Sequence, residues 1–263
     1  RSSNNFGQLG SPPTHPELLD YLATQFAQSG WKLKALHKMI MTSRAYQMSS
    51  SMNEAGFAKD PDNDLFWRFD VRRLSAEEVR DSLLAVNGSL NPKLYGPSIY
   101  EKLPQEVLAR QSVPGKGWGN SSEEERNRRS IYIHVKRSLL TPILSVFDLP
   151  DTDHSCEARF TTLQPGQALS LLNSEFVHTQ AKRLATSINQ MIDGGTQQKL
   201  TAAFELVYAR DATPEEIEDV MELIRKLETD YKKSADEAFE LACLSMLNWN
   251  EFIFVDRRPR LCS

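Results

Sequence analysis

The sequence has 263 residues, of which 40% are hydrophobic and 25% are charged, and its formal net charge is −4. These proportions are typical of a soluble globular domain with a sizeable core. Basic residues are scattered among acidic ones, which argues against nucleic acid as a partner, and no apolar run approaches the roughly 20 residues of a membrane span.

The N-terminal segment is expected to begin with a linker and to continue as a helix. Residues 1–13 are polar and rich in Gly and Pro, as in a linker. Thr14 and Glu17 then stand three positions apart before an apolar pattern, which predicts a capping box and a helix start near His15. Gly30 is expected to end this helix. Its predicted buried stripe consists of Leu18, Leu22 and Phe26.

A second amphipathic helix is expected after the turn, so that the two helices form a hairpin. Its apolar positions are Leu33, Leu36, Met39 and Ile40. Trp31 lies in the turn, where its ring can cover the seam between the two helices.

The middle of the chain combines a well-marked helix with a long excursion. Ser75 and Glu78 form a second capping box, which predicts a helix that ends at Asn87 and Gly88. Residues 91–125 carry four prolines and several glycines. A connection of this length is typical of a functional loop.

The second half of the chain is predicted to be mainly helical. Residues 131–135 alternate between apolar and polar types, which favours a short strand, and a helix over 138–147 is expected directly after it. Further helices are expected over 167–173, 175–192, 196–208 and 235–249. Another is expected to start at Thr213, Pro214 and Glu216, which are typical of the first positions of a helix.

The predicted fold class is therefore mainly α. We expect a single-domain orthogonal helical bundle with long loops and at most a few short strands. The domain is predicted over residues 14–256, with a tail over 257–263.

Six blocks of the sequence carry a resemblance to a known family. They are THPELLDYLATQFAQSGWKLKALHKMIMTSRAY from Thr14, DPDNDLFWRFDVRRLSAEEVRDSLLAVNGSLN from Asp60, YGPSIY from Tyr95, RRSIYIHVKRS from Arg128, FDLPDTDHSCEARFTTLQPGQALSLLNSEFV from Phe147 and LNWNEFIFVD from Leu247. In this order they resemble a bacterial family of unknown function, number fifteen fifty-three. The family occurs in planctomycetes and their relatives, near the C-terminal end of large exported proteins that often carry a cytochrome-c-like domain.

The resemblance transfers no established activity, but it implies a context. It places the chain in the periplasm, at the cell surface or outside the cell. The implied partners are neighbouring domains or chains of the same exported protein or assembly, and cell-surface polysaccharide is a further candidate. The sequence contains no C-x-x-C-H motif, so any haem is expected in a neighbouring domain or chain.

A group of polar residues in the second half forms the candidate ligand site. Arginine suits carboxylate, sulfate or phosphate groups, and amide side chains suit hydroxyl-rich ligands, so a saccharide or sulfated glycan fits this chemistry. In the alternative reading, the arginines pair internally with residues 123–125, Asp148 and Asp151 and hold loops against the helices. The candidate residues are Arg129, Tyr132, Lys136, Arg159, Gln164, Gln167 and Asn173.

Two acidic segments raise the question of calcium. The DPDND run from Asp60 lacks the glycine and the glutamate that an EF-hand requires, which favours a turn stabilised by aspartate side chains. Asp148, Asp151 and Asp153 form a second acidic loop that could hold calcium in the same way. No transition-metal site is expected, because the histidines show no pairing on a helix face.

The three cysteines, Cys156, Cys243 and Cys262, lie at neither metal-clamp nor redox-motif spacing. Export would permit a bridge between Cys156 and Cys243, whereas the alternative is that the thiols stay free.

The sequence contains no recognised catalytic motif and therefore gives no support for enzyme activity, although it does not decide against it. The leading hypothesis is a non-catalytic binding or assembly domain of a large exported or cell-surface multi-domain protein. One alternative is a carbohydrate-active enzyme or glycan-binding accessory module. Another is a packing subunit of a haem-containing electron-transfer assembly.

Overall fold

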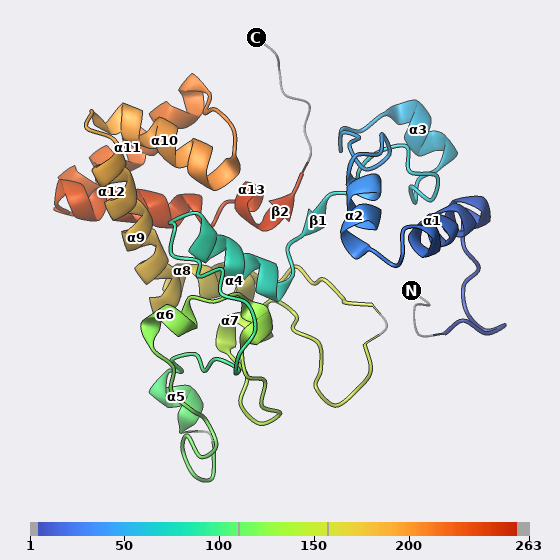
Figure 1. Ribbon diagram of the computed structural model, residues 1–263. Helices are drawn as coiled ribbons and strands as arrows, with labels where there is room; N and C mark the ends of the chain where they lie inside the picture. Colours follow the sequence, from blue (N-terminus) through green and yellow to red (C-terminus); the bar gives the residue numbers. More distant parts are fainter. Residues whose placement is uncertain (1–4, 110, 157, 257–263) are drawn as a thin grey trace. The chain divides into compact units, whose positions relative to one another are not determined.

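The computed structural model describes residues 5–109, 111–156 and 158–256, and within them the fold is mainly α with one two-stranded sheet (Figure 1). Contacts divide the chain into two compact units. Unit 1 comprises Arg1–Arg73 and Phe254–Ser263, and unit 2 comprises Leu74–Ile253. The mainly α prediction is confirmed, whereas the predicted linker and tail include residues 1–4 and 257–263, which lie outside the described residues.

Unit 1 contains the predicted helical hairpin. Its elements are α1 (Pro16–Gln28), α2 (Leu33–Met41), α3 (Glu54–Lys59), β1 (Arg72–Arg73) and β2 (Phe254–Val255). The two strands are antiparallel, with Arg72 opposite Val255 and Arg73 opposite Phe254.

The predicted capping box at Thr14 does not form. The N-cap residue of α1 is His15, which has no side-chain cap, and Pro16 starts the helix. Thr14 is therefore one position too early to cap, and its hydroxyl oxygen instead lies 3.0 Å from His15 Nδ1. Proline suits the first helical position because its missing N–H would have no intrahelical partner there.

The predicted turn of the hairpin is confirmed, but the predicted burial of its apolar stripe is wrong. Gly30 has φ 72°, a left-handed conformation that glycine adopts without strain. The Trp31 ring meets the Phe26 ring edge-on, with centroids 5.2 Å apart. Neither α1 nor α2 contains a buried residue, and 44% of Leu18 is exposed. One side of each helix is partly buried, and the two helices contact each other.

Unit 2 contains most of the helices. Its elements are α4 (Ala76–Ala85), α5 (Gln105–Leu108), α6 (Glu123–Arg126), the 3-10 helix η1 (Ser130–Tyr132), α7 (Pro142–Val146), α8 (Pro165–Asn173), α9 (Glu175–Met191), α10 (Thr196–Tyr208), α11 (Pro214–Thr229), α12 (Ala235–Met246) and α13 (Asn250–Ile253).

The core of unit 2 forms where α12 packs between α9 and α11 (Figure 1). Leu184 and Ile188 of α9 are fully buried, as are Ala242 and Cys243 of α12. Leu184 and Ile188 are four residues apart and so share one face of α9, which is the pattern that the sequence predicted for this helix.

Local capping signals fix the starts of several helices. The capping boxes predicted for α4, at Ser75 and Glu78, and for α11, at Thr213 and Glu216, are both present. Pro214 occupies the first turn of α11 as expected.

The strand predicted over 131–135 is wrong. Residues Ser130–Tyr132 form a 3-10 helix, and only Ile133 makes a bridge, to Ile99. The three apolar positions of the alternating pattern do not share one buried face, because Ile133 is buried at its bridge to Ile99, whereas 73% of Ile131 and 47% of Val135 are exposed. The helix predicted directly after it is shorter than expected and begins at Pro142.

Candidate functional site

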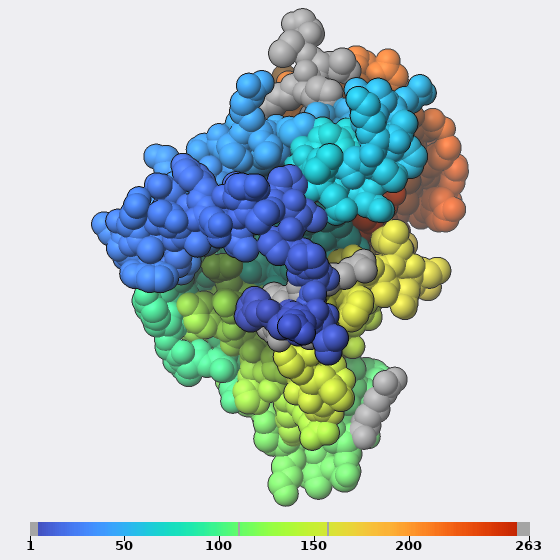
Figure 2. Space-filling view, turned by 90° about the vertical axis from the view of Figure 1, so that its right-hand side faces the viewer, coloured from blue at the N-terminus to red at the C-terminus, as the bar shows by residue number. Residues whose placement is uncertain are grey.

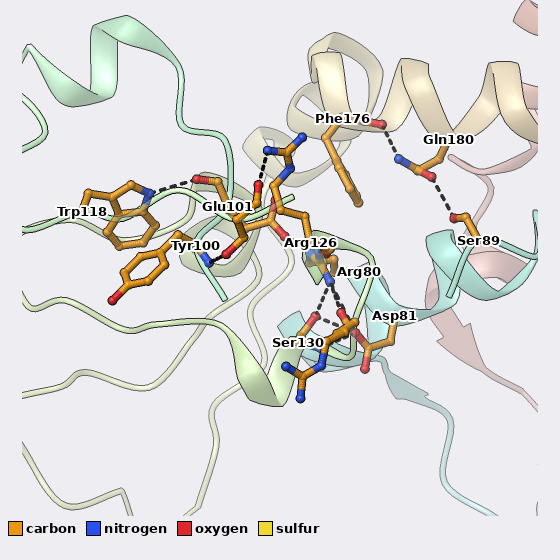
Figure 3. A network of polar contacts seen from close by, with 12 residues as sticks. Arg80, Asp81, Ser89, Tyr100, Glu101, Trp118, Arg126, Ser130, Phe176 and Gln180 are labelled. Atoms are coloured by element: carbon orange, nitrogen blue, oxygen red, sulfur yellow. Dashed lines mark hydrogen bonds and ion pairs between the residues drawn. The ribbon is translucent and has the colours of Figure 1, made fainter. Parts of the chain in front are cut away.

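The polar residues nearest to the predicted ligand site are organised around a buried arginine of α4. Arg80 is 1% exposed and forms an ion pair with Glu101. Its Nη1 also donates to the backbone oxygen of Arg128 at 3.1 Å and to Ser130 Oγ at 3.2 Å. Figure 3 shows Arg80 beside Ser130 and Asp81. These contacts join α4 to two segments that are distant in sequence, so the role of Arg80 is to hold them together.

Asp81, the next residue of α4, fixes the start of η1. Its Oδ1 accepts hydrogen bonds from the backbone N–H of Ser130 at 2.7 Å and from Ser130 Oγ at 2.6 Å. Its other oxygen lies 3.7 Å from Nε of Arg129, whose side chain is 55% exposed. Arg129 is therefore accessible, but a carboxylate already lies beside its guanidinium.

Arg128 is fully buried and secures the 91–125 excursion. Its guanidinium lies 3.9 Å from the centroid of the Tyr132 ring and donates to Glu125 Oε2 at 3.1 Å. It also donates to the backbone oxygens of Lys93 and Pro97, both at 3.3 Å. Buried arginines need such partners, because an unpaired charge is costly away from water.

Tyr132 belongs to the same arrangement, because its hydroxyl oxygen accepts the backbone N–H of Tyr95 at 2.8 Å. The excursion therefore contacts Tyr132 through a hydrogen bond and Arg128 through several. Lys136, the next candidate along the chain, donates to the backbone oxygen of Lys116.

Arg159 forms a two-point ion pair with Glu77, the residue after the first position of α4. Its Nη2 donates to Glu77 Oε1 at 2.8 Å, and its Nη1 donates to Glu77 Oε2. The hydrogen bond to Glu77 raises the pKa of Arg159. Burial acts to raise the pKa of Glu77, but the hydrogen bond from Arg159 outweighs it together with smaller favourable interactions, so this pKa is lowered.

The amide residues of the predicted site stabilise α8 and the segment before it. Gln167 is buried, and its Nε2 donates to the backbone oxygens of Thr162 at 3.1 Å and Val146 at 3.2 Å. Gln164 and Gln167 together form a capping box at the start of α8. Asn173 Nδ2 donates to the backbone oxygen of Leu169 at 2.9 Å.

The candidate residues thus fall into separate groups. Arg129 and Tyr132 lie at η1, Gln164 and Gln167 at the start of α8, and Arg159 at Glu77. A hollow of about 140 Å³ in unit 2 has a different lining, which includes His178, Lys233 and Leu241. The glycan site remains a prediction.

The internal pairing that the sequence offered as the alternative is present, with partly different partners. Arg128 pairs with Glu125 as expected. Asp148, however, accepts hydrogen bonds from Thr162 Oγ1 at 2.8 Å and from the Thr162 backbone N–H at 2.9 Å. Asp151 accepts the backbone N–H of Asp153 at 2.9 Å.

Exposed apolar side chains lie close in sequence to these polar groups, and the sequence reasoning missed them. We call them the apolar strip. Thr162, which lies between two of these side chains in sequence, donates a hydrogen bond to Asp148. The face of α8 that carries Gln167 and Leu171 is buried. The members of the strip, with their exposed fractions, are Phe160 (84%), Leu163 (72%), Leu169 (57%) and Leu172 (44%).

One signal in the sequence could have revealed part of the strip. The α8 segment PGQALSLLN carries leucines on more than one face, and only Leu171 among them is buried. A helix with apolar residues beyond its buried face has a second apolar surface, and such surfaces mark interaction sites when they are exposed together.

The acidic segment at Asp60 forms the predicted turn. Asp60 Oδ1 accepts the backbone N–H of Asp64 at 3.0 Å, and Oδ2 accepts that of Leu65 at 2.8 Å. In residues 5–109, 111–156 and 158–256, no cluster of three or more His, Cys, Asp or Glu side chains could hold a metal ion. Calcium binding stays a prediction.

Cys156 and Cys243 are both free thiols, so the bridge between them that the sequence permitted is not formed. Cys156 is exposed, whereas Cys243 is buried in α12. Cys262 lies outside the described residues. No helix in the described part of the chain has the length and apolar character to cross a membrane.

Comparison with known proteins identifies a family without a known activity. The matching family model is PSD1, described as "Protein of unknown function (DUF1553)", and it covers residues 1–224. The block at Leu247 lies beyond the matched range. No curated protein and no solved structure matches the chain. Because the match extends over most of the sequence, the chain belongs to the PSD1 family of proteins of unknown function (DUF1553).

Proposed function

We propose that this chain is a non-catalytic binding or assembly domain that contacts another protein through the apolar strip. The partner is a neighbouring domain or chain of the same exported protein or assembly. In this proposal, the chain works in the periplasm, at the cell surface or outside the cell, and any haem belongs to a neighbouring domain or chain.

The observation that carries the proposal is the contrast between the polar groups and the apolar strip. Arg80, Arg128 and Arg159 are all bound to carboxylates of this chain. Phe160 and Leu163, in contrast, expose most of their surface. Exposed apolar surface is costly in water, and its burial against a partner supplies about 25 cal/mol for each Å² covered.

The carbohydrate alternative would require Arg159 to hold a ligand. Its guanidinium already makes two hydrogen bonds to Glu77, which a ligand would have to replace. The haem-assembly alternative differs from our proposal only in the kind of partner.

Site-directed photo-cross-linking tests the proposal in cells of the native host. A benzoylphenylalanine placed at Leu169 would lie within the apolar strip. The matched control is the same residue at Thr186, an exposed polar position of α9 in the same unit. We expect a reproducible cross-linked product from Leu169, identified by mass spectrometry as one protein or as another part of the same polypeptide.

A product that forms equally from Thr186 would indicate random collision and would contradict the proposal. The absence of any product from Leu169 would contradict it as well.

A further inference from the structure

The α1–α2 hairpin of unit 1 exposes apolar and basic side chains together, and the proposed assembly function does not use them. Neither helix contains a buried residue. Figure 2 shows the N-terminal segment in blue. The exposed residues of this hairpin indicate which kind of partner it binds.

The exposed face of α2 carries a line of two apolar residues and a histidine beside two lysines. Leu33, His37 and Met41 recur every four residues and therefore lie along one line of the helix. Leu33 is 59% exposed and Met41 is 54% exposed. Lys34 and Lys38 lie one position further around the helix, so they flank this line.

The tip of the hairpin presents an exposed aromatic ring next to a lysine. Trp31 is 70% exposed and has φ 61°. It is followed directly by Lys32. The other tryptophans, Trp67, Trp118 and Trp249, are all partly buried. Tryptophan is enriched at boundaries between water and lipid because its ring is apolar and its N–H is polar.

The charge of this region has one sign. Residues 21–53 contain no Asp and no Glu, but they contain Lys32, Lys34, Lys38 and Arg44. None of these four cations forms an ion pair within the part of the chain that the structure describes. The acidic residues of α1, Glu17 and Asp20, lie in its first half, away from the tip.

We propose that the α1–α2 hairpin binds the surface of an anionic phospholipid membrane. Trp31, Leu33 and Met41 would enter the boundary between headgroups and acyl chains, and the lysines would contact lipid phosphates. A helix that mixes exposed apolar residues with lysines is typical of segments that lie in this boundary without spanning the bilayer.

An acidic protein is the competing partner, and the shape of unit 1 favours the lipid. Protein partners usually place anchoring side chains in pockets. A hollow of about 480 Å³ in unit 1 is lined by Met48, Met52, Lys59 and Trp67 among others, and no residue of α1 or α2 contributes to it. The cationic face of the hairpin is an open helical surface.

Co-sedimentation with vesicles tests this proposal. One set of vesicles contains equal parts of phosphatidylglycerol and phosphatidylcholine, and the other contains phosphatidylcholine alone. We expect the whole chain to bind the anionic vesicles at low salt, to bind them less in high salt, and to bind the neutral vesicles weakly. Quenching of the exposed Trp31 by brominated lipid should accompany binding.

Two variants test the residues of the hairpin. Lysines near an anionic surface each contribute about fivefold to binding, so the triple substitution Lys32→Gln, Lys34→Gln and Lys38→Gln should weaken binding about 100-fold. Trp31→Asn should weaken binding about tenfold or more and remove the quenching. Asparagine tolerates positive φ, so this substitution keeps the turn.

The matched controls lie in unit 2. Lys102→Gln, Lys182→Gln and Lys226→Gln remove the same total charge from exposed lysines. Tyr231→Asn removes an aromatic ring that is 71% exposed. Both controls should bind anionic vesicles nearly as well as the wild type.

Three outcomes would overturn the proposal. The first is that the wild type does not bind anionic vesicles. The second is that the control variants lose as much binding as the hairpin variants. The third is binding to an acidic peptide without binding to vesicles, which would assign the hairpin to a protein partner. None of these outcomes bears on the apolar strip, which lies in unit 2.

Discussion

Arg80 of α4 and Glu101 of the 91–125 excursion form a buried ion pair, in which the side chains are 1% and 9% exposed. The pair ties the longest irregular segment of unit 2 to a core helix. Its position explains why a segment with only two short helices, α5 and α6, keeps a defined path.

Glu101→Gln should therefore destabilise the protein strongly. The substitution removes the carboxylate closest to the buried charge of Arg80 and leaves Asp81 Oδ1, 3.8 Å from Nη1, as its remaining ion-pair partner. Removal of one partner of a buried pair costs about 3–5 kcal/mol. Urea unfolding measures the change. The control is Lys102→Gln in the adjacent pair with Glu175, in which 70% and 81% of the side chains are exposed. That change should cost less than about 1 kcal/mol, and equal losses would contradict the role of the buried pair.

Acid should weaken the contacts by which Arg210 joins Glu216 of α11 to Glu251 of α13. Arg210 donates two hydrogen bonds to Glu216, at 2.8 and 2.6 Å, and two to Glu251, both at 2.6 Å. The hydrogen bond from Arg210 lowers the pKa of Glu216 below its ordinary value of 4.5. Because the pKa is lower in the folded state, the stabilisation is complete above about pH 4.5 and is lost as the pH falls through the folded-state pKa.

The variant Arg210→Gln should reduce this pH dependence. It should lower the free energy of unfolding at neutral pH and flatten its decline below pH 4.5. Urea unfolding at a series of pH values measures both effects. A variant whose acid-side slope equals that of the wild type would show that Glu216 does not carry the effect.

The two described cysteines should react very differently. Burial raises the pKa of the Cys243 thiol to about 12, so almost no thiolate is present near neutral pH. Cys156 is exposed. Iodoacetamide at mildly alkaline pH should modify Cys156 in the folded protein and Cys243 only after unfolding, as peptide mass spectrometry would reveal. Rapid modification of Cys243 in the folded protein would contradict its burial.

Gly56 should tolerate no side chain. A Cβ atom there would lie 2.6 Å from Trp67 Cε3, and the Trp67 ring is held by a hydrogen bond of 2.8 Å from its Nε1 to the Asp60 backbone oxygen. Gly56→Ala should cost about 1–3 kcal/mol through overpacking.

The matched control for this substitution is Gly166→Ala in the first turn of α8. Nothing lies within 4 Å of a Cβ atom at that position, so the change should be neutral or slightly stabilising. Thermal unfolding distinguishes the two variants, and equal midpoints would argue against the close contact at Trp67.

Local signals in the sequence were sufficient to predict many helices. Thr196–Tyr208 begins and ends where the sequence indicated, and the capping box at Thr213 marks the start of α11. These features depend on residues within a few positions of one another. The strand prediction for 131–135 was wrong because the contacts of this region are not local: Ile133 pairs with Ile99, and Ser130 is bound by Asp81.

The candidate site shows the same division. The hydrogen bonds of Gln164 with Gln167 are local, and the sequence placed both residues in one group. The partner of Arg159 is Glu77, which lies 82 positions earlier. A single sequence contains no signal for such a contact, and it contains none for the exposure of Phe160, which depends on what packs nearby.

The most direct test of the assembly proposal compares two variants in the photo-cross-linking measurement from Leu169. Phe160→Ser with Leu163→Ser removes two exposed apolar side chains, each worth about 1.5–3 kcal/mol when buried, so the cross-linking yield should fall at least tenfold. Arg159→Ala should leave the yield nearly unchanged, because its charge already serves Glu77. A yield that survives the loss of Phe160 and Leu163 but disappears with Arg159→Ala would contradict the account and place the binding site at the arginine.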